Sequence, residues 1–311
     1  MYRSVWNGDQ MHFKETRREF LSALAATSAI CAIPGYAARS AGLIRYGYAA
    51  ITWNANDRQA IEDIAAVGYP GIQIRANAIA EFKPDELKDL LAWHKLTFVA
   101  LSSTAPSLDI PEDVDVAKQV ANAKFAHDAG ALYLQLIDQN TVYQRVVTPD
   151  ECRRLGKRLT EIGKHTADLG IPIGYHNHLT TISERPENLD LVLESADPKY
   201  VKLELDTAHY VAGGGDPARA IEKYHDRLLF LHLKDVIDLP SETPSVRYPF
   251  EFVELGRGRV DIPSVFKALR KVRYRGWAVV ELDRVPDATR TPKECAVISR
   301  NYLMQQIGEK V

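Results

Sequence analysis

After Gly42, the chain repeats one pattern: a short apolar run is followed by a polar stretch with helical spacing. The eight apolar runs are LIRYGYA, GIQIR, LTFVALSS, ALYLQLI, IPIGYH, VKLELD, LLFLHLK and WAVVEL. Strands that alternate with helices predict a parallel sheet. Eight such units within about 265 residues are typical of a closed α/β barrel, the (β/α)8 or TIM barrel. We therefore expect a single barrel domain over residues 42–311.

The stretches between the strands predict helices whose ends carry recognisable signals. Four of them are Asp57–Val67, Pro84–His94, Val114–Ala129 and Pro149–Leu169. Glycine commonly ends a helix, and we expect that role for four glycines that precede a strand: Gly68, Gly130, Gly170 and Gly276. No glycine-rich phosphate-binding motif follows the first strand, which argues against a dinucleotide-binding fold.

Residues 1–41 differ in kind from the rest of the chain. They hold the twin arginines Arg17 and Arg18, then a mild apolar run, and small residues at 38–41 that suit a signal peptidase. This segment resembles a twin-arginine (Tat) export signal, which predicts cleavage and a periplasmic or extracellular protein. The alternative is an amphipathic N-terminal helix. Because the apolar run is too short to span a bilayer comfortably, we expect no stable membrane anchor.

Charge and cysteine content exclude several classes of function. The chain has 39 basic and 41 acidic residues, a formal charge of −2, and no basic block. Removal of residues 1–41 takes away five basic and three acidic residues, which brings the charge to −4. A nucleic-acid partner is therefore disfavoured. Cys152 and Cys295, the cysteines beyond residue 41, are too far apart in sequence to predict a disulfide framework or a cysteine metal site.

Four consecutive predicted strands end in side chains that bind metals: His176, Asp206, His232 and Glu281. One such residue alone is more often a core or capping group. In a barrel, however, the carboxyl ends of all strands meet at one rim, so these four side chains converge. Imidazole and carboxylate ligands together suit Mn, Fe, Co, Zn or Mg. The sequence predicts one divalent metal ion at this rim, with Mn as the first choice.

Several segments together carry a family resemblance: YHNH, LDTAHYVAGGGDP, FLHLKDV, LGRGRVD and GWAVVELDR. They resemble the sugar phosphate isomerase/epimerase superfamily of xylose isomerase-like barrels, and most closely its inosose (2-keto-myo-inositol) dehydratase branch. The resemblance covers nearly all of residues 42–311. It implies that Asp206, His232 and Glu281 are metal ligands. His176 stands where the superfamily commonly has a glutamate ligand.

The histidine at position 176 bears on the reaction, because many epimerases of the superfamily use the carboxylates of strands five and eight as a pair that moves protons on opposite faces of the substrate. With His176 in place of the first carboxylate, the imidazoles of His176 and His178 better suit a one-base enolisation followed by loss of a leaving group. The resemblance also points to Glu184, near a position where the dehydratase branch has Glu or Gln.

Further residues are candidate substrate contacts. The resemblance implies that His209 lies near metal and substrate; the alternative is that Asp206 caps the next helix and His209 is exposed. Lys234 shares a strand face with His232 and either polarises a substrate oxygen or forms an ion pair with Glu204 or Asp206. Trp53 either contacts sugar or fills the barrel. The same two interpretations apply to other residues at strand ends: Tyr48, Gln73, Arg75 and Gln135.

The predicted reaction starts from a keto-sugar or keto-inositol. The metal ion stabilises an enediolate while a base (His178, His176 or Glu281) removes the neighbouring proton. Return of the proton gives isomerisation or epimerisation, and expulsion of a β-oxygen gives dehydration. A non-catalytic carbohydrate-binding accessory subunit is the alternative, and self-association into a homo-oligomer stays open. An endonuclease-IV-like phosphodiesterase is disfavoured, because strands two to four end in IRAN, LSST and LIDQ without the ligands required.

Overall fold

The computed structural model describes residues 44–104, 106–140, 142, 145–240 and 249–311. The predicted export signal at residues 1–41 lies outside the described residues. In the part of the chain that is described, no helix is both long and apolar enough to cross a membrane.

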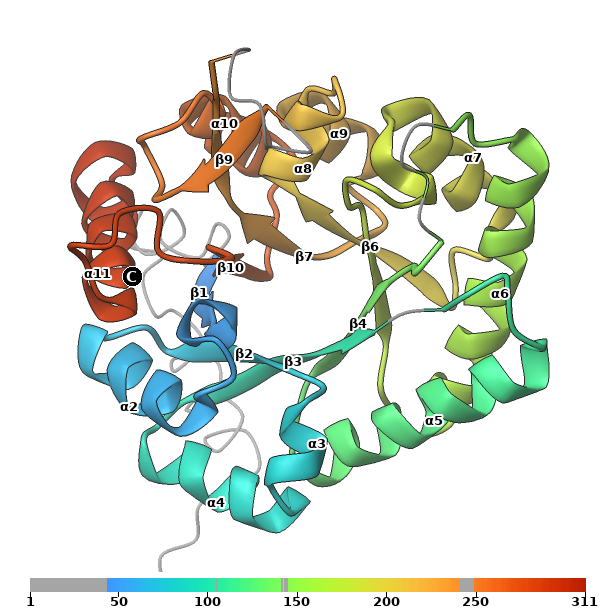
Figure 1. Ribbon diagram of the computed structural model, residues 1–311, viewed down its shortest axis with the longest axis horizontal. Helices are drawn as coiled ribbons and strands as arrows, with labels where there is room; N and C mark the ends of the chain where they lie inside the picture. Colours follow the sequence, from blue (N-terminus) through green and yellow to red (C-terminus); the bar gives the residue numbers. More distant parts are fainter. Residues whose placement is uncertain (1–43, 105, 141, 143–144, 241–248) are drawn as a thin grey trace, which may run out of the picture. The chain divides into compact units, whose positions relative to one another are not determined.

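Eight parallel strands close into a barrel in the order β1-β10-β7-β6-β5-β4-β3-β2 (Figure 1). The strands are β1 (Arg45–Ala49), β2 (Gly71–Arg75), β3 (Thr97–Thr104), β4 (Tyr133–Ile137), β5 (Ile173–His176), β6 (Val201–Asp206), β7 (Leu228–Leu233) and β10 (Trp277–Val280). Each of the eight predicted apolar runs coincides with one of these strands, and only β3 extends beyond its run, by one residue. The (β/α)8 prediction is therefore confirmed.

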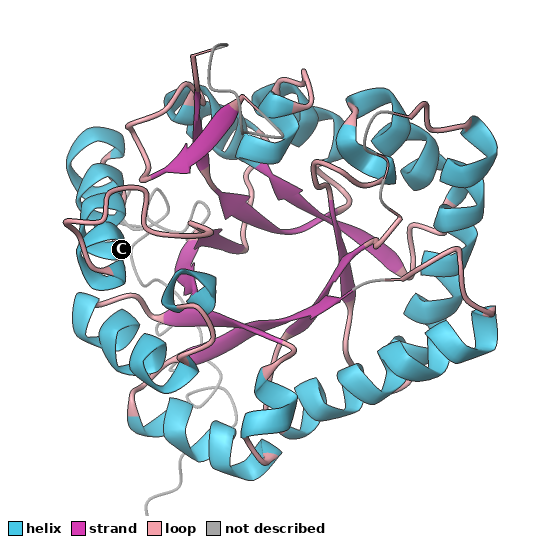
Figure 2. Cartoon of the chain, viewed as in Figure 1, coloured by secondary structure: helices cyan, strands magenta, loops and turns pink. Residues whose placement is uncertain are grey.

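Helices form an outer ring around the barrel (Figure 2). The longer helices are α2 (Asp57–Val67), α4 (Pro84–Trp93), α5 (Glu112–Asp128), α6 (Pro149–Ala167), α7 (Pro186–Ser195), α9 (Pro217–Tyr224), α10 (Ile262–Lys271) and α11 (Pro292–Tyr302). Shorter elements are η2 (Ala50–Trp53), α3 (Ala78–Glu81), η3 (Ile182–Glu184), α8 (Thr207–Ala212) and η4 (Leu303–Ile307). All four predicted helices are present, and their ends differ from the predicted ones by at most two residues.

The glycine prediction holds at three positions and was wrong at the fourth. Gly68, Gly130 and Gly170 have positive φ angles, as expected for residues that end helices. After α10, it is Arg273 that has positive φ (55°). Gly276 serves a different purpose, because a Cβ there would lie 2.2 Å from the hydroxyl oxygen of Tyr274.

The barrel interior is apolar below the rim and polar at the rim. Ala49, Val99, Phe230, Trp277 and Val279 pack together inside the barrel. Phe230 and Trp277 lie two and four residues before His232 and Glu281 on the same strand faces, so they form the floor under those polar groups. On β6, Val201, Leu203 and Leu205 belong to the larger core between strands and helices.

An additional two-stranded antiparallel sheet follows β7, and the sequence analysis did not predict it. It consists of β8 (Asp235–Asp238) and β9 (Phe250–Val253). The carboxylate of Asp235 accepts hydrogen bonds from the backbone N–H groups of Val236, Gly256, Gly258 and Val260, at 2.9–3.0 Å. These bonds hold the loop between β9 and α10 against the barrel rim.

Candidate active site

Four buried side chains meet at the carboxyl end of the barrel, one from each of four neighbouring strands. His176, Asp206 and His232 lie on β5, β6 and β7, and Glu281 follows β10 directly. One ligand atom from each lies within 4.8 Å of those of the other three. The backbone N–H of Glu281 donates to the carbonyl oxygen of Leu233 at 3.0 Å, which continues the strand pairing and fixes the height of this carboxylate.

The polar atoms of this cluster suit a divalent cation. His176 Nδ1 and Asp206 Oδ2 are buried and have no hydrogen-bond partner among the described residues. His232 Nδ1 lies 2.9 Å from Glu281 Oε2. A buried polar atom without a partner costs about 1–3 kcal/mol, so two beside each other call for a ligand. Two imidazoles and two carboxylates form a donor set that fits Mn, Fe, Co or Zn. The four residues therefore fit the predicted metal site.

Surrounding polar groups orient these side chains. His232 Nε2 lies 2.8 Å from Gln73 Oε1 and 2.7 Å from Glu204 Oε1. Both neighbours are acceptors, so Nε2 carries a proton and Nδ1 is the nitrogen that faces the cluster, where a bound metal ion would replace its proton. Gln135 Nε2 in turn donates to Glu204 Oε1 at 2.9 Å.

Asp206 serves two purposes with its two oxygens. Oδ1 accepts a hydrogen bond from the backbone N–H of His209 at 2.8 Å and thereby caps α8. Oδ2 is the atom left without a partner in the cluster. The Asn177 side chain exchanges hydrogen bonds with the backbone N–H and carbonyl of Asp206, at 2.9 and 3.2 Å, which fixes the end of β6. The helix-cap and metal-ligand interpretations are thus compatible.

The carboxylates of the cluster are ionised. Burial would raise the pKa of Glu281, but the charges of His232 and Lys234 bring it well below its ordinary value. At Asp206, burial likewise raises the pKa, but Lys234 and His232 outweigh it, so the pKa lies below its ordinary value. For His232, burial lowers the pKa, while Glu204 and Glu281 raise it well above the usual range.

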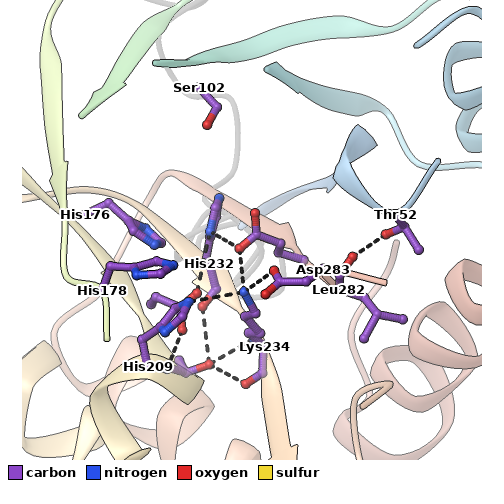
Figure 3. A network of polar contacts seen from close by, with 12 residues as sticks. Thr52, Ser102, His176, His178, His209, His232, Lys234, Leu282 and Asp283 are labelled. Atoms are coloured by element: carbon purple, nitrogen blue, oxygen red, sulfur yellow. Dashed lines mark hydrogen bonds and ion pairs between the residues drawn. The ribbon is translucent and has the colours of Figure 1, made fainter. Parts of the chain in front are cut away.

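Lys234 is a buried cation beside the cluster (Figure 3). Its Nζ lies 3.0 Å from Glu281 Oε2 and 2.5 Å from Asp283 Oδ1, and 4.1 Å from the centre of the Phe252 ring. The predicted ion pair with Glu204 or Asp206 was wrong, because the partners are Glu281 and Asp283. Burial lowers the pKa of Lys234, but Asp283 and Glu281 raise it above the ordinary value, so the ammonium stays charged.

His178 and His209 stack with ring centres 3.9 Å apart. His178 Nδ1 contacts the carbonyl oxygen of Leu179, which can only accept, so Nδ1 carries the proton and Nε2 is free to accept one. Burial lowers the pKa of His178 to about 4, assisted by the charges of His176 and Lys234. His178 is therefore a neutral imidazole near pH 7, as a general base requires.

His209 is buried, and the alternative of an exposed side chain was wrong. Its Nδ1 accepts from the N–H of Leu179 at 3.3 Å, and its Nε2 lies 3.3 Å from Lys234 Nζ. A neutral imidazole cannot accept at both nitrogens, so one of these contacts is only a close approach. Burial, together with the charges of His178 and Lys234, lowers the pKa of His209 well below its ordinary value.

A cavity of about 750 Å³ opens beside the cluster. From the cluster side it is lined by His176, His178, Lys234, Glu281 and Asp283. The remaining lining residues come from other elements: Ile51, Arg75, Ala76, Asn77, Ile79, Ala80, Ser102, Lys118, Asn122, Ile137, Asp138 and Gln139. Ser102 lies across from the histidines in Figure 3.

Besides His209, which is not among the described residues that line this cavity, Trp53 and Glu184 are predicted substrate contacts that are not brought to it. The indole Nε1 of Trp53 donates to Asp63 at 2.9 Å, and its ring meets Tyr48 edge-on. Glu184 accepts a hydrogen bond from the backbone N–H of Thr180 at 2.8 Å and lines a separate pocket of about 470 Å³. Neither is among the described residues that line the larger cavity.

The sequence analysis missed several residues of the site. Asp283 shares a face with Glu281, so strand alternation could have identified it. Lys118 and Asn122 line the cavity from α5, one helical turn apart, and only the packing of that helix reveals it. Thr52 reaches the rim from η2, where its hydroxyl donates to the carbonyl of Leu282 at 2.5 Å.

Comparisons with known proteins agree with this architecture. The sequence model of the xylose isomerase-like TIM barrel family matches residues 61–301. Inosose dehydratase of Geobacillus thermodenitrificans (strain NG80-2) is 28% identical over 294 residues, which cover 85% of this chain and 98% of that protein. Inosose dehydratase of Lacticaseibacillus casei is 27% identical over 290 residues, 84% of this chain and 96% of that protein.

Solved structures show the same fold at lower identity. The IolI protein with a bound zinc atom superposes with a TM-score of 0.72 at 18% identity, over 85% of this chain and 98% of that one. The probable 3-DHS dehydratase AsbF from Bacillus anthracis gives 0.69 at 18%, over 85% of this chain and 100% of that one. An L-ribulose 3-epimerase gives 0.68 at 16% identity, over 84% and 93% of the two chains. With its closed barrel and the family match over most of its length, this chain belongs to the xylose isomerase-like TIM barrel family.

Proposed function

We propose that the protein is a divalent-metal-dependent enzyme, an isomerase/epimerase or a dehydratase, that acts on a keto-sugar or keto-inositol. The observation that carries this proposal is the buried cluster of His176, Asp206, His232 and Glu281 with its unpartnered donor atoms. The relatives named inosose dehydratase support a carbohydrate substrate. The size and position of the adjacent cavity support a small-molecule ligand.

The four cluster residues would hold the metal, with Mn as our first choice. A bound divalent ion supplies Lewis-acid stabilisation of the negative charge that develops on the substrate's carbonyl oxygen. The protein's own groups prepare the site for this charge. Lys234 keeps a positive charge beside Glu281, and the apolar floor of Phe230 and Trp277 excludes water from below.

His178 is the base that removes the proton from the carbon next to the carbonyl. It lines the cavity, is neutral near pH 7, and has Nε2 available as acceptor. As the C–H bond breaks, its electron pair forms the carbon–carbon double bond of the enediolate.

We favour dehydration over epimerisation as the outcome. Epimerisation needs two proton carriers, one on each face of the substrate. At the position on β5 where a carboxylate would be the second carrier, this protein has His176. In dehydration, the enediolate collapses, the β-carbon–oxygen bond breaks, and the departing oxygen takes the proton that His178 has received. The names of the inosose dehydratase relatives support this choice.

The test is proton–deuterium exchange in D2O with a panel of keto-sugars and keto-inositols, combined with metal analysis of the purified protein. We expect bound metal, exchange next to the carbonyl, and loss of exchange on chelation. Absence of metal together with absence of activity after addition of Mn would overturn the proposal and favour a non-catalytic carbohydrate-binding subunit.

We further propose that residues 1–41 direct export to the periplasm through the twin-arginine route. Arg17 and Arg18 support this proposal. Replacement of both by lysine should leave an uncleaved precursor in the cytoplasm, whereas unchanged processing would argue against it.

A further inference from the structure

The cavity has a second side that carries positive charge and no candidate metal ligand. Arg75 lies at the end of β2, and Lys118 reaches the cavity from α5. In the closed barrel, β2 is four strands away from β6 in either direction, so Arg75 lies on the side opposite Asp206. A substrate that occupies the cavity would therefore meet the metal cluster at one end and these cations at the other.

Arg75 has an unsatisfied donor at this place. The residue is half-buried, its Nε is buried, and that N–H has no hydrogen-bond partner among the described residues. No ion pair of Arg75 within 4.0 Å is found in the described part of the chain either. Nε itself is out of reach of a ligand in the cavity, but the guanidinium of this cavity-lining residue presents further planar N–H donors that suit a carboxylate or a phosphate.

A structural role for Arg75 is the main alternative, because Asp57 lies near. Asp57 is nearly fully buried, and burial raises its pKa, while Arg75 lowers it through space. The direct partner of the Asp57 carboxylate, however, is Asn77, whose Nδ2 donates to Oδ2 at 3.1 Å. Asp57 therefore does not use the donors of Arg75, which remain available to the cavity.

Other acidic groups around the cavity already have partners. Glu281 and Asp283 both pair with Lys234. Asp138 accepts hydrogen bonds from the Tyr175 hydroxyl and from the backbone N–H of Ile182, at 2.8 and 3.2 Å. Lys118 is exposed and has no ion pair among the described residues. Arg75 and Lys118 are thus two cations that line the cavity without an ion pair among the described residues.

We propose that the substrate carries an anionic group, a carboxylate or a phosphate, remote from its reacting carbonyl, and that Arg75 binds this group with assistance from Lys118. This inference rests on the proposed function for the identity of the reacting end. It narrows the substrate class from keto-sugars in general to acidic or phosphorylated keto-sugars.

The experiment compares three ligands that differ only in the group at carbon 6: D-fructose, its 6-phosphate and its 6-carboxylate, fructuronate. Binding to the metal-loaded protein is measured by calorimetry, and exchange next to the carbonyl is measured in parallel. Arg75→Gln and Lys118→Gln are the test variants. Arg154→Gln is the matched control, because this exposed residue of α6 does not line the cavity.

We expect the wild-type protein to bind an anionic ligand about 10- to 100-fold more tightly than fructose, the range for a charged hydrogen bond. Arg75→Gln should abolish this preference, Lys118→Gln should reduce it by a smaller factor, and Arg154→Gln should leave both the preference and the affinity for fructose unchanged. Added salt should weaken the preference, since Lys118 is exposed to solvent. Comparison of phosphate and carboxylate identifies the natural group.

Equal affinity for the three ligands, absence of binding, or a preference that survives Arg75→Gln would overturn the inference. A charge preference that depends on Arg75 but comes without isotope exchange would support the anion site and contradict the proposed enolisation. Isotope exchange with all three ligands at equal affinity would support the proposed enolisation and contradict the anion site.

Discussion

The two halves of the barrel rim are built in different ways. From β5 to β10, the functional groups lie at the ends of strands, and Asp206, His232 and Glu281 are each fixed by a backbone hydrogen bond or a buried polar neighbour. From β2 to β4, the cavity is lined largely by loop residues, by α3 and by one face of α5. The first half suits chemistry that needs fixed distances, and the second suits recognition of a variable part of the substrate.

The largest effect is expected from Asp206→Asn. Asparagine caps a helix about as well as aspartate, so α8 should keep its N-cap. The charged ligand is lost, however, and we expect metal content to fall together with kcat/KM by about 10³-fold. Metal analysis, exchange kinetics and thermal denaturation check this together. Unchanged metal content and unchanged kcat/KM would mean that Asp206 is only a cap.

His178→Ala should lower kcat by about 10²- to 10³-fold and leave the bound metal in place. In the wild-type protein, kcat/KM should stay constant as pH falls through 6.5 and decline only near pH 4, because protonation of a base with a pKa of about 4 removes its activity below that pH. An acidic limb near pH 6.5 would contradict the assignment of His178 as the base.

Gln73→Leu tests whether the β2–β4 half of the rim influences metal binding by the β5–β10 half. Gln73 belongs to β2, yet its Oε1 accepts a hydrogen bond from His232 Nε2. Its replacement removes an orienting contact of a ligand, for which a loss of about 10- to 100-fold in metal affinity is expected. Titration of the metal-free protein measures this. An unchanged affinity would show that Glu204 alone orients His232.

The smallest effect is expected outside the rim. Thr148 and Glu151 form a capping box at the start of α6. Thr148→Ala should reduce the free energy of unfolding by about 1 kcal/mol, with kcat and KM unchanged. Denaturant titration and steady-state kinetics provide the check. A change in kcat would mean that the helix ring and the rim are coupled.

Much of the β5–β10 half could be predicted from sequence, because the position of each ligand follows from where a strand ends. His176, Asp206, His232 and Glu281 converge for that reason alone. Strand alternation also placed His178 and Lys234 correctly near the cluster. The ion-pair partners of Lys234 could not be predicted, since they depend on which of several nearby carboxylates the folded rim brings within reach.

The residues of the β2–β4 half could not be predicted as reliably from the sequence. A residue at the end of an early strand, such as Arg75, was one of several equivalent candidates, and Trp53 turned toward Asp63 instead of the cavity. Lys118 and Asn122 looked like ordinary residues of a helix, because no periodicity in the sequence tells which face of α5 overhangs the cavity. The β8–β9 sheet was missed because β8, with the sequence DVID, does not stand out as an apolar run.

Asp235 has a consequence for how this protein can be redesigned. Its single carboxylate accepts four backbone N–H groups, three of them from the loop before α10, and it directly follows Lys234 in the chain. Insertion or exchange of that loop would disturb the lysine beside Glu281. The segment from Ala76 to Ala80 carries no such attachment to the ligand cluster. Libraries that alter substrate range should therefore diversify residues 76–80 and the cavity face of α5, and leave the β9–α10 loop intact.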